Sequence, residues 1–372
     1  MKFSCEKLLL LTAILTAMRA AATKSPVPLL EGLLLEASDE SVKISGYDLK
    51  TGIVTTIPAQ VEVVGGIVLN ARLFSEIIRK MPGQYVTISV NSGYAAEISS
   101  EMSEFEILGS PISDYPELPS IDGQDFLEIN ESLLKKMIAQ TNFAVSDNES
   151  RPIHTGALFE TSDGELTIVA VDGYRLALRR EPLENADVSD LSFVVPGSAL
   201  SEVEKIVTDG EEMVKITLGS KHILFSIGDT LLISRRLEGE FLNYKNSIPH
   251  SANFQIKVEK DELISAVERV SLIISDKLKS PVRCVFGDGV LNLYSASALG
   301  KASDECVIEG NGEELEIGFN DKYLIEALKA APADKVNLEL NTGVTPCIIS
   351  PAGEESNFLY MILPVRLKAY DG

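Results

Sequence analysis

The sequence contains no tryptophan, and it has only three histidines and four cysteines among 372 residues. The histidines, His154, His222 and His250, are dispersed, and no cysteine pair has the C-x-x-C spacing of a metal or redox site. No P-loop, no G-x-G-x-x-G after a strand and no nucleophile elbow occurs. These absences argue against an enzyme, a bound metal or a cofactor, and they predict a non-catalytic protein.

Long apolar runs are also missing. No run approaches the ~18 residues needed to span a membrane, so we expect no membrane partner. Apolar residues make up 45% and charged residues 24% of the chain, which is typical of a folded globular protein. The cysteines lie in apolar or alternating stretches, and we interpret them as reduced core residues: Cys5, Cys284, Cys306 and Cys347.

Basic charge is scarce. The formal net charge is -22, because 33 Lys and Arg oppose 55 Asp and Glu. Such acidity would ordinarily argue against a nucleic-acid partner, since phosphate binding requires clustered Lys and Arg. Net charge does not report how the charges are distributed, however, and the distribution depends on the secondary structure.

The N-terminus imitates a signal peptide, with Lys2, an apolar run from Leu8 to Leu11 and small residues from Ala20 to Ala22. Cleavage there would make the protein secreted, and a secreted acidic β-rich binding protein is therefore the alternative function. Glu6 and Arg19 at the two ends of the run argue against a signal peptide. An internal repeat instead predicts that the segment is a structural helix.

One pattern recurs three times along the chain. Phe3, Cys5, Leu10 and Ile14 match one later set near residue 130 and another near residue 260, with the same offsets of five and nine residues from the second position. The later sets are Phe126, Ile129, Leu134 and Ile138, and Phe254, Val258, Leu263 and Val267. Each set predicts a strand followed by a helix, because residues spaced by four share one helical face.

Three further elements repeat in the same order. Alternating apolar residues predict strands ending near Asp48, Asp172 and Ser297; helical spacing follows at 69–77, 195–203 and 319–327, and strands centre on Ile88, Ile216 and Leu338. The repeat predicts an α+β fold of three tandem modules, 1–124, 125–251 and 252–372, each with two helices on about eight short antiparallel strands. Two such arcs, paired symmetrically, would form a ring-shaped homodimer.

The balance of basic and acidic residues differs between the predicted helices and the rest of the chain. The predicted helices 7–20, 70–81, 131–143, 197–207, 259–273 and 320–330 hold twelve Lys and Arg against ten Asp and Glu, so the acidity lies in strands and loops. A mildly positive helical lining could hold duplex DNA without reading its sequence. Ordinary solvated helix faces are the other interpretation of the candidate DNA-binding residues: Lys24, Arg72, Arg79, Lys80, Lys135, Lys136, Asn148, Arg151 and Lys205.

Three motifs carry a family resemblance: residues 171–177 (VDGYRLA), 241–249 (FLNYKNSIP) and 360–367 (YMILPVRL). Together they closely resemble the bacterial DNA polymerase III beta subunit, the sliding clamp, over essentially the whole chain. The resemblance implies a cytoplasmic processivity factor: a ring-shaped homodimer that encircles duplex DNA and tethers polymerase, loaded by an ATP-driven clamp loader. It implies as partners the polymerase III catalytic subunit and other polymerases and repair proteins, bound through a linear peptide motif.

The resemblance also implies a partner-peptide cleft. Its residues in this chain would be His154, Val171, Gly173, Arg175, Leu176, Leu242, Ser247, Met361, Leu363, Pro364, Val365 and Arg366. Taken alone, Asp172-Gly173 also predicts a tight turn between strands, and Leu363 to Leu367 a final core strand. His154 and Ser247 stand where the family usually has apolar residues, and Lys368 to Gly372 extend past the usual end.

The implied dimer contact joins the end of the first module to the first helix of the third. It would use Ile77, Met81, Phe105, Leu272 and Ile273. Glu104 and Glu106 flank Phe105, where the family often carries basic residues that face an acidic partner. The apolar contact is kept but the family's charge complement is not, so we expect a dimer that is weaker than those of the family or paired differently.

Overall fold

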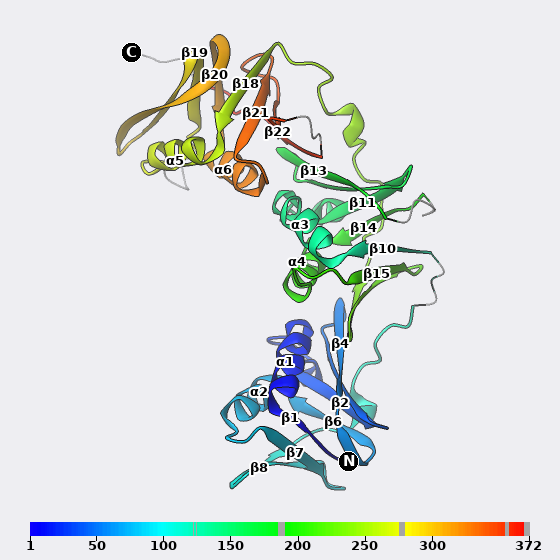
Figure 1. Ribbon diagram of the computed structural model, residues 1–372. Coiled ribbons are helices and arrows are strands. Elements are labelled where there is room, and N and C mark those ends of the chain that lie inside the picture. Colours follow the sequence, from blue (N-terminus) through cyan, green and yellow to red (C-terminus); the bar gives the residue numbers. More distant parts are fainter. Residues whose placement is uncertain (122, 124, 185–189, 275–279, 354–356, 368–372) are drawn as a thin grey trace. The chain divides into compact units, whose positions relative to one another are not determined.

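The computed structural model describes residues 1–372 apart from 122, 124, 185–189, 275–279, 354–356 and 368–372 (Figure 1). Gln124, at the first predicted boundary, and the C-terminal extension from Lys368 to Gly372 thus lie outside the described residues. The chain divides into two compact units, residues 1–135 with 201–236 and residues 136–200 with 237–372. The division falls inside helices α3 (Glu131–Ala139) and α4 (Gly197–Ile206).

The first unit contains a five-stranded antiparallel sheet, β5-β1-β7-β8-β9, and an eight-stranded one, β10-β15-β16-β17-β4-β3-β2-β6. Helices α1 (Lys7–Ala17) and α2 (Ala71–Lys80) pack on each other, and α1 also packs on β3 and β4. The strands are β1 (Lys2–Glu6), β2 (Gly32–Ser38), β3 (Ser41–Tyr47), β4 (Thr51–Pro58), β5 (Gln60–Val63), β6 (Gly65–Asn70), β7 (Tyr85–Val90), β8 (Ala95–Ser100), β9 (Ser103–Leu108), β10 (Phe126–Asn130), β15 (Met213–Leu218), β16 (His222–Ile227) and β17 (Thr230–Arg235).

The second unit contains one ten-stranded sheet in the order β14-β11-β12-β13-β23-β22-β21-β18-β20-β19, with helices α5 (Lys260–Ser271) and α6 (Asp321–Ala330) packed together. Its strands are β11 (Gly156–Ser162), β12 (Glu165–Val171), β13 (Arg175–Pro182), β14 (Ser192–Pro196), β18 (Phe254–Glu259), β19 (Val282–Ser297), β20 (Gly300–Phe319), β21 (Lys335–Leu340), β22 (Cys347–Pro351) and β23 (Phe358–Ile362). Two of these strands, β19 and β20, are long.

The six predicted helices are confirmed, with ends within a few residues of those expected. Asparagine side chains cap three of them: Asn70 Oδ1 accepts from the Leu73 N–H at 3.0 Å, and Asn130 and Asn320 do the same for α3 and α6. The expectation of about eight short strands is wrong for the third module. There β19 and β20 form one long ribbon whose register shifts around Asp288, so bulges replace the turns that would separate shorter strands.

The signal-peptide-like segment forms β1 and α1. Phe3, Leu10 and Ile14 are fully buried in the core of the first module, as the repeat predicted. In the described part of the chain no helix is both long and apolar enough to cross a membrane. All four cysteines are free and buried, and burial raises the pKa of Cys5 to about 12 and that of Cys306 to about 11. The thiols are therefore core residues, as expected.

Two strand pairings join consecutive modules. In the first unit β17 pairs with β4, and in the second unit β23 pairs with β13. In each case the last strand of one module extends the sheet of the module before it. Among the described residues, β9 pairs with β8 alone, and residues 300–307 of β20 pair with β19 alone. Both are therefore unpaired sheet edges; the other end strands of the described sheets are β5, β6, β10, β14 and β19.

Candidate functional site

The turn between β12 and β13 is built by an aspartate. Asp172 Oδ1 accepts from the backbone N–H groups of Tyr174 at 2.8 Å and Arg175 at 3.0 Å, and its own N–H donates to the Arg175 carbonyl. Gly173 has φ +92°, which favours glycine, and no heavy atom lies within 4 Å of where its Cβ would be. The tight turn predicted for Asp172-Gly173 is thus confirmed, and it leaves open space above Gly173.

The same turn occurs in the first module. Asp48 Oδ1 accepts from the N–H groups of Lys50 at 2.9 Å and Thr51 at 2.7 Å, but the residue at the left-handed position is Leu49. The aspartate turn thus recurs in the first two modules, and of these two only the second has glycine at the left-handed position. This difference provides a matched control for tests of the turn's function.

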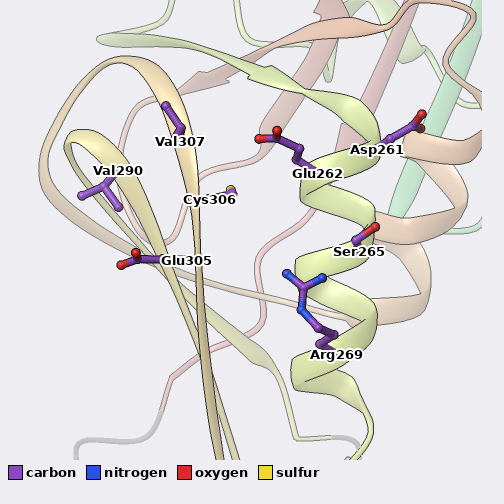
Figure 2. A pocket seen from close by; sticks show the side chains of 8 residues that line it. All are labelled: Asp261, Glu262, Ser265, Arg269, Val290, Glu305, Cys306 and Val307. Carbon is purple, nitrogen blue, oxygen red and sulfur yellow. The ribbon is translucent and has the colours of Figure 1, made fainter.

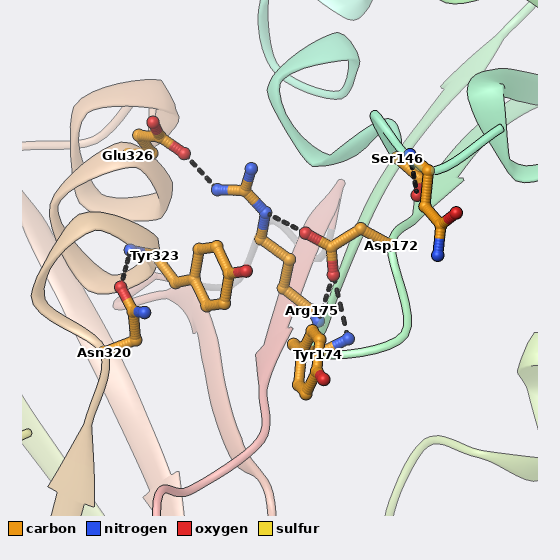
Figure 3. A network of polar contacts seen from close by, with 8 residues as sticks. Ser146, Asp172, Tyr174, Arg175, Asn320, Tyr323 and Glu326 are labelled. Atoms are coloured by element: carbon orange, nitrogen blue, oxygen red, sulfur yellow. Dashed lines mark hydrogen bonds and ion pairs between the residues drawn. The ribbon is translucent and has the colours of Figure 1, made fainter. Parts of the chain in front are cut away.

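Arg175 is held by contacts inside the second unit (Figure 3). Its Nε donates to Asp172 Oδ2 at 2.9 Å, and its Nη1 pairs with Glu326 of α6. The guanidinium also lies over the ring of Tyr323, 4.5 Å from its centroid, and near that of Phe143. The side chain is only 10% exposed, so Arg175 ties the β12–β13 turn to α6 and has little surface for a bound peptide.

An apolar cluster lies where β13 and β23 pair. Leu176 is opposite Met361 in the ladder, and both are buried together with Val171. The cluster's other buried members are Leu158, Val169, Leu178, Val194, Tyr244 and Ile348. Side chains from β11, β12, β13, β14, β22 and β23 therefore form one apolar layer, nearly all of it buried, which we call the junction surface.

Less buried side chains border the junction surface. Phe241 packs against it, and the ring of His154 in the short helix 152–155 meets Phe241 edge to face at 5.6 Å. Burial, and secondarily the charge of Arg151, lower the pKa of His154, so the ring is neutral at pH 7. Leu242 is exposed, and Ser247 donates to the Asn243 carbonyl. The imidazole thus adds an uncharged ring to this border.

The segment after β23 is not the core strand considered as an alternative. The strand ends at Ile362, and two backbone hydrogen bonds hold the next residues: Leu363 N–H to the Tyr174 carbonyl and Val365 N–H to the Gly318 carbonyl, each 2.8 Å. A Cβ on Gly318 would lie 2.6 Å from the Val365 oxygen. Pro364 is half-buried, and Arg366 is exposed. A side chain at position 318 would therefore force a shift of this segment or of residue 318 itself.

A hollow of about 530 Å³ lies between α5, β19 and β20, and both charged and apolar side chains line it (Figure 2). Asp261, Glu262 and Arg269 line it from α5, and Arg269 pairs with Asp304 of β20. Val307 at its rim is largely exposed. Among the described residues, no group of His, Cys, Asp and Glu could hold a metal ion, here or elsewhere.

The structure divides the candidate DNA-binding cations into two groups. Arg79 pairs with Glu76, Lys135 with Asp209 and Lys205 with Glu202, so their charges are partly neutralised. The other cations are at least partly exposed and make no ion pair with a described residue: Lys24, Arg72, Lys80, Lys136 and Arg151. Asn148 lies in the exposed loop before Arg151, where its side chain accepts from Ser150.

The expected dimer residues do not all lie at the surface. Ile77 and Met81 are 5% and 2% exposed in the core of the first module, where they fill the space between α2 and the sheet. Their assignment to a subunit contact is therefore corrected. Phe105 on β9 and Leu272 after α5 are exposed, and Ile273 is partly exposed.

Sequence reasoning missed several residues of the site. Tyr174 and Tyr323 stack with their ring centroids 6.2 Å apart, and Phe241, Ile153 and Ile348 pack at the junction surface. Tyr174 and Phe241 lie inside the three family motifs, so the motifs themselves could have identified them. Tyr323 could not be found in this way, since only the fold brings α6 to the β12–β13 turn.

Comparison with known proteins shows which family the chain belongs to. The N-terminal, central and C-terminal domain models of the DNA polymerase III beta subunit match residues 1–119, 128–243 and 245–366. A beta sliding clamp of Staphylococcus aureus is 34% identical over 98% of this chain and 99% of its own length. No finding supports the alternative of a secreted binding protein.

Solved structures of the same family are similar to this chain over nearly its whole length. The DNA polymerase sliding clamp of Bacillus subtilis is 33% identical, with a TM-score of 0.94 over 99% of this chain and 100% of that chain. The DNA polymerase beta subunit of Streptococcus pyogenes is 29% identical, with a TM-score of 0.93 over the same shares. The chain therefore belongs to the DNA polymerase III beta subunit family, the beta sliding clamps, and is a non-catalytic DNA sliding clamp.

Proposed function

We propose that two copies of this chain pair reciprocally into a ring that encircles duplex DNA in the cytoplasm, each contributing modules 1–124, 125–251 and 252–372. The unpaired edges of β9 and of residues 300–307 of β20 are the observation that carries the proposal. Two copies related by a two-fold axis would satisfy both edges of each chain, as closed homo-oligomers do. Phe105, Leu272 and Ile273 would lie at these contacts.

The DNA would be held by weak contacts to phosphates. The cations Lys24, Arg72, Lys80, Lys136 and Arg151 are the strongest candidates, with Asn148 beside them. Arg79, Lys135 and Lys205 would contribute less, because their acidic neighbours already satisfy part of their charge. Contacts to phosphates carry no sequence information, so the ring would slide.

The junction surface would bind a linear peptide of the partners: the polymerase III catalytic subunit, the clamp loader, and other polymerases and repair proteins. Its apolar floor, including Val171, Leu176 and Met361, suits hydrophobic anchors, and Met adapts to different side chains. Open space above Gly173 would admit a peptide backbone. Arg366, the exposed cation of the C-terminal segment, is free to meet a peptide carboxylate.

A comparison of circular with linear DNA tests the ring directly. The protein is loaded onto nicked circular DNA by a clamp loader and isolated by gel filtration, and the circle is then cut at a single site. We expect the protein to remain on the circle and to leave after linearisation, because free ends release a ring. Retention on linear DNA with free ends would show that ordinary affinity holds the protein.

The peptide site is tested by Leu242→Glu, with Leu49→Glu as the matched control. Both leucines are exposed, so neither change is expected to unfold the protein. A fluorescent peptide with two hydrophobic anchors should bind the Leu242→Glu variant at least ~10-fold more weakly, since one buried charge or lost anchor costs more than 1.4 kcal/mol. Equal losses in both variants would argue against this site.

A further inference from the structure

Basic residues gather at one end of the β16-β17-β4 ladder, inside the first unit. His222 lies opposite Arg235 in this ladder, so the two side chains share one face of the sheet. The Arg235 N–H donates to the Lys50 carbonyl at 3.1 Å, and the Arg236 N–H donates to the Lys221 carbonyl at 3.0 Å. These contacts bring together five basic residues, which we call the basic cluster: Lys50, Lys221, His222, Arg235 and Arg236.

The cations of the basic cluster are not neutralised by their surroundings. Lys50, Lys221 and Arg235 are exposed, Arg236 is half-buried, and none of the four makes an ion pair with a described residue. Asp48 stands at the same turn as Lys50, but its Oδ1 already accepts two backbone N–H groups of that turn. The cluster therefore stays positive in a chain whose formal net charge is -22.

The imidazole of His222 adds a neutral polar group to the cluster. Burial, and then the charges of Arg235 and Lys221, lower the pKa of His222, so the ring is uncharged at pH 7. The positive charge at neutral pH thus comes from the Lys and Arg side chains, and the ring provides a further hydrogen-bonding group beside them. Donors of this kind suit carboxylates, with which they form charge-assisted hydrogen bonds.

The basic cluster lies on the sheet face opposite α1. On β2, Leu33 belongs to the core beneath α1, whereas the next residue, Leu34, packs with Tyr47 on the other face. Ladder pairing leads from Tyr47 through β4 to Ile233, and Arg235 is two residues further along the same face. The sheet therefore separates the cluster from α1 and α2, and α2 carries candidate DNA-binding cations.

The β17–β4 and β23–β13 pairings share a backbone frame but differ in chemistry. The Leu363 N–H donates to the Tyr174 carbonyl just as the Arg235 N–H donates to the Lys50 carbonyl, and each bond lies two residues beyond a ladder pair. Apolar and aromatic side chains occupy these positions beside the junction surface. Cations occupy them at the β17–β4 pairing, which therefore offers a surface for charged groups.

We propose that the basic cluster binds an acidic, extended segment of a partner protein. The four cations would pair with carboxylates of that segment, since they make no ion pair with a described residue. The encircled duplex fits less well, because the sheet lies between the cluster and the helices of this unit. Single-stranded nucleic acid fits less well too, because the cluster has no Phe, Tyr or Trp on which bases could stack.

The cluster is distinct from the junction surface. All of its residues belong to the first unit, whereas the junction surface belongs to the second. The acidic segment would therefore be a second docking element, and its binding does not depend on the peptide site proposed above.

Charge neutralisation tests the site. Binding of a fluorescein-labelled, glutamate-rich peptide to the full chain is measured by fluorescence anisotropy at low salt, for wild type and for the Lys221→Ser, Arg235→Ser variant. Both side chains are exposed, so the protein should remain folded. We expect the affinity to fall at least ~10-fold, because two charge-assisted contacts are lost.

The Lys2→Ser, Lys43→Ser variant is the matched control. It changes the net charge equally, but these two lysines pair with Glu62 and Glu36 elsewhere in the first unit. Peptide affinity should stay within about twofold of wild type, since distant surface charges are screened. Equal losses in the two double variants, or no binding of the peptide to the wild-type chain, would overturn the proposal.

Two further measurements fix the class of ligand and its place. A labelled single-stranded oligonucleotide is titrated in the same way, and a loss of oligonucleotide affinity alone in the Lys221→Ser, Arg235→Ser variant would overturn the proposal in favour of nucleic acid. Leu242→Ser, beside the junction surface, should leave the affinity of the glutamate-rich peptide unchanged. A loss there would place the acidic peptide at the junction surface and contradict a second site.

Discussion

Replacing Arg175 by alanine should destabilise the second unit, because the guanidinium joins the β12–β13 turn to α6. The change removes the 2.9 Å hydrogen bond to Asp172, the cation–π contact with Tyr323 and the ion pair with Glu326. A hydrogen bond to a charged group contributes about 1.5–3 kcal/mol and a cation–π contact about 0.5–1 kcal/mol. Glu326 is half exposed, so its pair adds less than about 1 kcal/mol.

These contributions predict a loss of about 2–5 kcal/mol in the free energy of unfolding for Arg175→Ala. Urea unfolding followed by circular dichroism measures the loss. Tyrosine fluorescence gives a second signal for unfolding, since the chain contains ten tyrosines and no tryptophan. Glu326→Gln is the control, and it should lose less than about 1 kcal/mol because it removes only the exposed partner.

The affinity of a partner peptide is then measured without urea, where the Arg175→Ala and Glu326→Gln variants both remain folded. A stability within about 0.5 kcal/mol of wild type, as for a typical surface substitution, together with a large loss of peptide affinity, would refute the reasoning. It would mean that the guanidinium faces the peptide and does not hold the turn.

Further outcomes are expected at the peptide site, the DNA lining and the core. Peptide affinity should be constant above pH 6.5 and should fall as the pH decreases below it, because protonation of His154 places a charge against the apolar border. In a binding titration, His154→Leu should abolish this pH dependence. Gly318→Ala should weaken peptide binding at nearly unchanged secondary structure by circular dichroism, since its methyl would displace the C-terminal segment. Lys136→Ala should shorten the residence of the loaded protein on DNA more than Lys205→Ala, whose cation is already paired with an acidic neighbour; equal effects would contradict the division of the cations. None of the four thiols should react with Ellman's reagent until the protein unfolds.

Local patterns predicted most of the secondary structure. Helix periodicity predicted all six helices. The repeat correctly predicted a helix in residues 7–20, where the structure has α1 at Lys7–Ala17. Patterns of this kind are readable because the buried face of a helix or strand imposes its own spacing on the chain. The family resemblance implies a dimer contact that includes Ile77 and Met81, and only the structure shows that both side chains are buried in the first module.

The sequence by itself determined the threefold repeat, the six helices, the buried thiols and the motifs around the β12–β13 turn, since each is read from the spacing of residue types within short segments. Only the tertiary structure decided which side chains meet across modules. It directed Arg175 toward Tyr323 and Glu326, placed Leu176 opposite Met361, and left Phe105 exposed on an unpaired edge. Strand register between distant segments is set by the packing of whole faces, and a shift of one residue would exchange every pair.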